Sequence, residues 1–60
     1  MATQDRLEEL LADLAMEVGI AQDLAGHGKL DRVLVAMDRV LEARQAVVTE
    51  VRRLVTRRTA

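Results

Sequence analysis

Residues 30–55, LDRVLVAMDRVLEARQAVVTEVRRLV, decide the fold of this chain. Apolar residues recur through this stretch at alternating intervals of three and four, which places their side chains on one side of an α-helix. This seam consists of Leu30, Val33, Met37, Val40, Arg44, Val47, Val51 and Leu54. A second column, at intervals of seven, consists of Leu34, Leu41, Val48 and Val55. The pattern predicts a helix over about 29–57 whose apolar band is wide enough to touch two neighbouring helices.

The first part of the chain carries a matching pattern. Its heptad seam consists of Leu7, Leu10, Leu14, Glu17, Ala21 and Leu24. Leu11, Val18 and Ala25 widen this seam into a stripe, which predicts a helix over about 4–25. Gly26 stands where a left-handed C-terminal cap belongs, so we expect a turn over 26–28.

The segment GHGKL, residues 26–30, resembles the end of a phosphate-binding loop. A Walker loop needs a glycine five residues before Gly28 and a hydroxyl residue after Lys29, and it follows a buried strand. The chain has Asp23 and Leu30 at those positions, and a predicted helix precedes them. We therefore interpret GHGKL as a hairpin corner with His27 as a solvated turn residue.

Length and composition predict a single unit, the helical hairpin of residues 1–60, that oligomerises. The chain has 60 residues with no Cys, one His and no Phe, Tyr or Trp. A single core in a domain of this size is marginal, and small folds usually compensate with disulfides, a metal or oligomerisation. We expect an all-α helical hairpin that dimerises into an antiparallel four-helix bundle, because α-helical residues beyond about 51 would extend past the first helix and expose Val51, Leu54 and Val55.

The expected oligomer interface takes in both apolar columns of the second helix. It consists of Leu30, Val33, Leu34, Met37, Val40, Leu41, Arg44, Val47, Val48, Val51, Leu54 and Val55. Arg44 and Glu17 are the charged members of the two seams, and two interpretations of them are open. Arg44 pairs with an acid such as Glu17 or Asp13 of a second chain and so fixes its register, or both side chains extend to solvent at the edge of the bundle.

Charge is distributed unevenly along the chain. Residues 1–25 carry a net charge of −5 and residues 29–60 carry +4, which favours antiparallel pairing of the two helices. The basic C-terminal cluster consists of Arg52, Arg53, Arg57 and Arg58. It complements the helix dipole, or it makes sequence-independent contacts with nucleic-acid phosphates. A third candidate surface, for docking another protein, consists of Ala12, Met16 and Ile20.

The sequence predicts a non-enzymatic adaptor or regulatory module whose partner is itself and another protein, with weak nucleic-acid binding as the alternative. No set of nucleophile and base, metal-ligand spacing or cofactor motif is present in the 60 residues, so we expect no catalytic residue, no cofactor and no metal. The N-terminus is acidic where a signal peptide is basic, and no apolar run is long enough to cross a membrane. We expect a cytoplasmic protein of bacterial or phage origin, the latter from its eight Arg and one Lys.

The expected hairpin is similar in shape and length to the ROP-type RNA-modulating dimers and to the dimeric docking helices of modular synthases. The similarity covers the helical architecture alone. No motif matches, so it implies no role for any residue of this chain.

Overall fold

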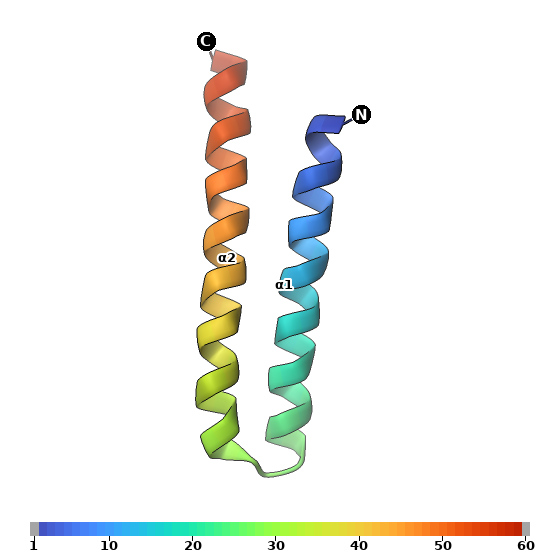
Figure 1. Ribbon diagram of the computed structural model, residues 1–60, viewed down its shortest axis with the longest axis vertical. Helices are drawn as coiled ribbons and strands as arrows, with labels where there is room; N and C mark the ends of the chain where they lie inside the picture. The colour runs from blue at the N-terminus through green and yellow to red at the C-terminus, as the bar shows by residue number, and fades with distance from the viewer. Residues whose placement is uncertain (1, 60) are drawn as a thin grey trace.

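Two α-helices joined by a tight turn make up the chain in this computed structural model (Figure 1). α1 spans Ala2–Gly26 and α2 spans Leu30–Thr59, so each helix end lies within two residues of its predicted bound. The structure describes residues 2–59 and the side chains of residues 5–58. The helices run antiparallel, which confirms the predicted all-α hairpin. Within the described residues, neither helix combines the length and the apolar character needed to cross a membrane.

The turn is closed by hydrogen bonds that cap the C-terminus of α1. The N–H of Lys29 donates to the carbonyl of Leu24 at 2.9 Å, and the N–H of Gly28 donates to the carbonyl of Ala25 at 3.0 Å. This pair of bonds defines a Schellman motif, whose left-handed residue is Gly28 with φ of 73°. The prediction of Gly26 as the left-handed cap is therefore wrong, because Gly26 is the last helical residue of α1.

The same short segment also begins α2. The carbonyl of Lys29 accepts hydrogen bonds from the N–H groups of Arg32 and Val33, each at 3.1 Å. The Nδ1 atom of His27 lies 2.8 Å from the carbonyl oxygen of Asp23, so a protonated Nδ1 caps the last turn of α1. Backbone groups of GHGKL are thus used by the two helix ends, and the segment is a structural corner.

The face of α1 that packs on α2 is the predicted seam. Half-buried or buried side chains recur along α1 at intervals of three and four, as the sequence pattern requires. They are Leu7, Leu10, Leu14, Glu17, Ala21 and Leu24. The prediction for this helix is confirmed residue by residue.

The face of α2 that packs on α1 differs from the predicted seam. The half-buried and buried residues along this seam are Val33, Ala36, Val40, Ala43, Val47, Glu50 and Leu54, and Ala46 and Val48 are half-buried on its two flanks. The predicted seam shares only one of its two columns with this face, namely Val33, Val40, Val47 and Leu54. Small Ala36 and Ala43 form the other column and let the helix backbones approach closely, whereas the bulkier residues chosen from the sequence are exposed.

The hairpin has almost no interior. Among the described side chains the buried residues are Ala21, Ala36 and Glu50, and no large side chain is fully buried. The molecule measures 48 × 18 × 10 Å, which is one helix layer thick. A single layer leaves each helix with apolar surface that its one neighbour does not cover.

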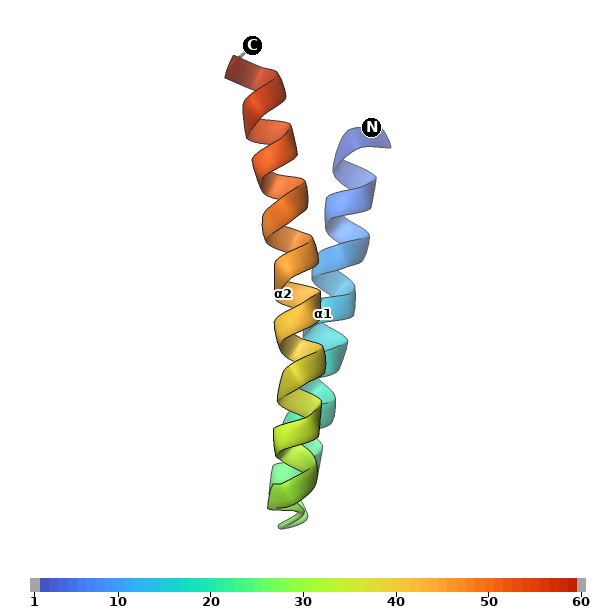
Figure 2. The same cartoon turned by 60° about the vertical axis from the view of Figure 1, so that its left-hand side comes forward.

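The two helices are closest near the turn and diverge toward their free ends (Figures 1 and 2). The C-terminal end of α2 projects beyond the start of α1 (Figure 1). The projection begins later than the sequence predicted, because Leu54 is half-buried and lines a groove together with Leu7. Val51 and Val55 are exposed, as expected.

Candidate functional site: an apolar face of the hairpin

A second heptad seam runs along α2 beside the one that packs on α1. We call it the outer stripe, and it consists of Leu30, Leu34, Met37, Leu41, Arg44, Val48, Val51 and Val55. Its members follow one another at intervals of four and three over the whole range, which is the spacing of a coiled-coil seam. Every member is exposed except Val48, which is half-buried. The eight residues were all part of the predicted oligomer interface, whereas the other four predicted members lie against α1.

The most exposed part of the outer stripe is its leucine-rich half next to the turn. Leu30 is 68% exposed and Leu34 is 73% exposed. Exposed apolar residues on protein surfaces are usually scattered singly, whereas a contiguous exposed set of this kind is typical of interaction surfaces.

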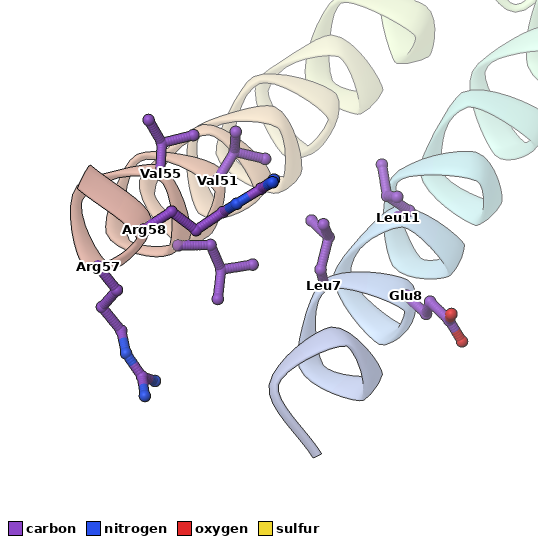
Figure 3. Close-up of a pocket in the computed structure, with 8 residues that line it drawn as sticks. Leu7, Glu8, Leu11, Val51, Val55, Arg57 and Arg58 are labelled. Atoms are coloured by element: carbon purple, nitrogen blue, oxygen red, sulfur yellow. The ribbon is translucent and has the colours of Figure 1, made fainter. Parts of the chain in front are cut away.

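Residues of α1 extend the same apolar surface. Leu11 and Val18 are exposed. Leu11 lines a groove together with Val51 and Val55, and Val18 follows Leu11 at an interval of seven, so both lie on the flank of α1 next to the outer stripe. In Figure 3, Leu11 points to the same side of the hairpin as Val51 and Val55. We call the outer stripe together with Leu11 and Val18 the apolar face.

An open groove lies in this surface where the helices diverge. It has a volume of about 570 Å³ and is lined by Leu7, Glu8, Leu11, Val51, Leu54, Val55, Arg57 and Arg58. Glu8 points away from α2, and Arg58 extends along the rim toward α1 (Figure 3). The floor of the groove is thus aliphatic, and its charges lie at the edge.

Arg44 is the charged member of the outer stripe. Its side chain is exposed, and among the described residues it makes no ion pair with Glu17 or with any other acid. Within one hairpin Arg44 is therefore an unpaired charge among the apolar residues of the outer stripe. An interchain pair of Arg44 with an acid stays a prediction.

Glu17 lies in the seam between the helices, where the sequence placed it. One of its carboxylate oxygens is buried and has no hydrogen-bond partner among the described residues. Glu17 also lines a second groove, on the side of the hairpin opposite the apolar face, together with Met16, Val35 and Arg39. Of the predicted docking residues, Met16 lies at this groove, and Ala12 and Ile20 are exposed elsewhere on α1.

A part-buried ion pair that the sequence did not reveal lies at the seam near the free ends of the helices. Glu50 is 8% exposed, and its two oxygens accept hydrogen bonds from Nε of Arg53 at 3.2 Å and from Nη2 at 2.6 Å. The hydrogen bond from Arg53 lowers the pKa of Glu50 below its ordinary 4.5, burial opposes this, and the charges of Arg53 and Arg6 lower it further. The same contact raises the pKa of Arg53. Glu50 follows Ala36 and Ala43 at intervals of seven, and this spacing was the available signal.

The four predicted nucleic-acid residues do not share one face of α2. Arg53 is engaged by Glu50, while Arg52, Arg57 and Arg58 are exposed and make no ion pair among the described side chains. At 3.6 residues per turn, positions 52, 57 and 58 project in three different directions. They surround the helix end and do not form a single basic surface.

Among the described residues, no group of three or more His, Asp or Glu side chains is placed to bind a metal ion. The sequence predicted no catalytic or cofactor-binding residue, so there is none whose position could be compared with the structure.

Comparison with protein-family models, curated proteins and solved structures gives no match to this chain.

Proposed function

We propose that the protein is a homodimeric helical module that acts through protein–protein contacts, as an adaptor or regulator. The observation that supports this most strongly is the apolar face, which exists beside a hairpin that buries no large side chain fully among its described residues. A single core is marginal in a chain of 60 residues without disulfides, and a second copy would add stability by covering both apolar faces at once. Two stacked hairpins make an antiparallel four-helix bundle.

The available surface is sufficient for such a dimer. A specific interface buries about 800 Å² on each partner, which is about one sixth of the 4887 Å² exposed by this chain. The apolar face follows most of the length of the hairpin on one side, so an interface of this size is compatible with it. The groove of Met16 and Val35 on the opposite side stays accessible in that dimer and is our candidate surface for a different protein.

Sedimentation equilibrium at micromolar concentration tests the proposal directly, and neighbouring residues of α2 provide a matched pair of variants. Leu34 lies on the outer stripe and Val35 lies in the opposite groove, and both are exposed in the hairpin. We expect Leu34→Asp to convert the dimer to monomers, because it introduces a charge into the interface. Val35→Asp makes the same change outside the interface and leaves the dimer intact. A wild-type chain that sediments as a folded monomer with cooperative thermal unfolding contradicts the proposal.

Weak binding of nucleic-acid phosphates is the second candidate function. It is supported by the three exposed arginines at the end of α2, which are free of ion pairs among the described side chains. Since they point in different directions and no aromatic residue is present for base stacking, any such binding is to the phosphate backbone and independent of sequence.

A further inference from the structure

The outer stripe has a polarity that is informative about how two copies meet. Its half next to the turn consists of Leu30, Leu34, Met37 and Leu41, and its other half consists of Arg44, Val48, Val51 and Val55. The first half carries long side chains that are flexible and strongly exposed, and the second carries shorter β-branched ones and one charge. The leucine-rich half of one copy can pack against the valine-rich half of another copy only when the two stripes run antiparallel.

We infer that the outer stripes of two copies pair antiparallel, in a single register, as the central seam of the dimer. This inference rests on the proposed homodimer and specifies its geometry. The alternation of four and three reads the same in both directions over these eight positions, so reversal brings every member opposite another member. The resulting layers are Leu30 with the partner's Val55, Leu34 with the partner's Val51, Met37 with the partner's Val48, and Leu41 with the partner's Arg44.

Packing volume favours the reversed arrangement. Three of the four kinds of layer in the antiparallel seam then combine a leucine or methionine with a valine, which keeps the helix separation uniform there, and the fourth combines Leu41 with Arg44. A parallel pair would place leucine against leucine near the turns and valine against valine near the free ends. The groove between the diverging helix ends, lined by Val51 and Val55, would then stay empty, whereas in the antiparallel pair it receives the partner's Leu30 and Leu34.

The charge in the stripe favours the same arrangement. In a parallel pair Arg44 faces the partner's Arg44 in the same layer, where two like charges are partly desolvated. In the antiparallel pair each Arg44 is level with the partner's Leu41, and the two guanidinium groups are displaced along the seam by about one helical turn. The partner's Asp38 stands on the flank of the seam within about one further turn, so it is the acid we assign to Arg44.

Residues along the outer flank of the stripe are complementary as well. They follow one another at intervals of seven and are Asp31, Asp38, Gln45 and Arg52. All four are exposed in the hairpin. Flanks of this type face each other in antiparallel coiled coils, so Asp31 of each copy lies beside the partner's Arg52, and the pair occurs twice by symmetry.

Cysteine cross-linking distinguishes the two orientations, because the natural chain contains no thiol. Two variants are prepared, Leu34→Cys and Val51→Cys, and each is oxidised alone and in an equal mixture. In the antiparallel seam residue 34 lies opposite the partner's residue 51, while identical positions are separated by about 25 Å, far beyond the reach of a disulfide. We expect disulfide-linked dimers in the mixture and only background amounts in either variant alone.

The outcomes separate the failure of this inference from the failure of the proposed function. Efficient linking of each variant with itself would overturn the antiparallel orientation and leave the homodimer intact. A lack of linking in every sample, with variants that sediment as dimers, would overturn the outer stripe as the seam. If wild-type protein and variants are folded monomers, both proposals are wrong.

A charge exchange tests the register without altering the apolar layers. Asp31→Arg and Arg52→Asp each place like charges side by side across the dimer, so each is expected to raise the dissociation constant several-fold at low salt. The double variant restores opposite charges and is expected to regain most of the wild-type affinity. A double variant that dimerises no better than the two single variants contradicts the assigned register.

Discussion

The carboxylate of Glu50, which lies in the seam between the helices, forms a two-point ion pair with the partly exposed guanidinium of Arg53, and the shorter contact is 2.6 Å. Arg53 keeps its own aliphatic and charged surface partly exposed, while Glu50 is buried. The guanidinium of Arg53, one turn further along α2, therefore compensates the buried negative charge of Glu50. The pair lies in the half of the hairpin where the helices diverge.

This pair predicts a pH dependence. Since the folded state lowers the pKa of Glu50 below 4.5, the ionised carboxylate stabilises the fold above that pH, and the contribution is lost as the pH falls through the lowered pKa. Glu50→Gln should reduce the free energy of unfolding at pH 7 and have a smaller effect near pH 3. Urea unfolding at both pH values measures this. Glu42→Gln, an exposed carboxylate on the same helix, is the control, and an equal effect of the two substitutions at pH 7 would contradict the role of the pair.

Glu17 should behave in the opposite way from Glu50. One of its oxygens is buried without a hydrogen-bond partner among the described residues, at a cost of about 1–3 kcal/mol. Glu17→Leu removes that oxygen and adds apolar contact in the seam, so we expect a higher free energy of unfolding. Thermal unfolding at fixed protein concentration tests this, with Glu9→Leu on the exposed side of α1 as the control. A lower melting temperature for Glu17→Leu would show that the carboxylate has a partner in the assembled protein.

The turn tolerates a side chain at one glycine and not at the other. Gly28 has φ of 73°, where a side chain costs about 1–2 kcal/mol, so Gly28→Ala should lower the melting temperature. Gly26 is helical, and a Cβ there would meet no atom within 4 Å, so Gly26→Ala should raise stability by about 0.5–1 kcal/mol. For a domain of this size, about 1 kcal/mol shifts the melting temperature by roughly 4–8 °C. Equal changes in melting temperature for the two variants would contradict a specific need for glycine at position 28.

Arg44 should determine orientation more than fold. In one hairpin Arg44 is exposed and unpaired among the described residues, so Arg44→Leu leaves the hairpin unchanged and adds apolar area to the outer stripe. We expect tighter association with mixed orientations or larger species, because the penalty on a parallel seam is removed. Light scattering and the cross-linking assay in the Arg44→Leu background measure this. Arg39→Leu makes the same change on the opposite side of α2 and should affect neither.

The C-terminal arginines give a prediction that depends on salt. Any retention on DNA or RNA at about 50 mM salt should fall steeply with added salt. Replacing Arg52, Arg57 and Arg58 with Gln should abolish it without loss of helicity. Retention that persists after this replacement would place the contact elsewhere. An absence of retention by the wild-type chain at 50 mM salt would remove nucleic acid as a candidate ligand.

The sequence predicted the inner face of α1 completely because five of its six members are apolar residues at alternating intervals of three and four, and Glu17 fills the one remaining place in that spacing. On α2 the predicted seam and the observed seam share the column that contains Val40 and Val47. The pattern alone could not decide whether the column of Met37 or the column of Ala36 completes the face that packs on α1. The decision depends on how closely the helix backbones approach, and small Ala36 and Ala43 permit the closer packing. Leu30 and Met37 therefore lie outside the face that packs on α1 and are exposed in the outer stripe, which supports the proposed function.

The turn and the ion pair escaped prediction for local reasons. Gly26 and Gly28 both fit a helix cap by composition, and the hydrogen bonds of Lys29 and Gly28 to α1 select the second. The apolar pattern gave no reason to bury Glu50, since carboxylates are rarely buried, and its burial follows from the shifted seam and from Arg53 three residues later.

Both free ends of the helices lie at one pole of the hairpin, and the turn lies at the other (Figure 1). In the antiparallel pair that we propose, each pole of the rod therefore carries one turn and the two termini of the other copy. Any protein joined to either terminus would be held apart from its counterpart at a spacing set by the 48 Å length of the hairpin. The chain would then serve as a rigid spacer of fixed length, with its cargo facing outward in opposite directions.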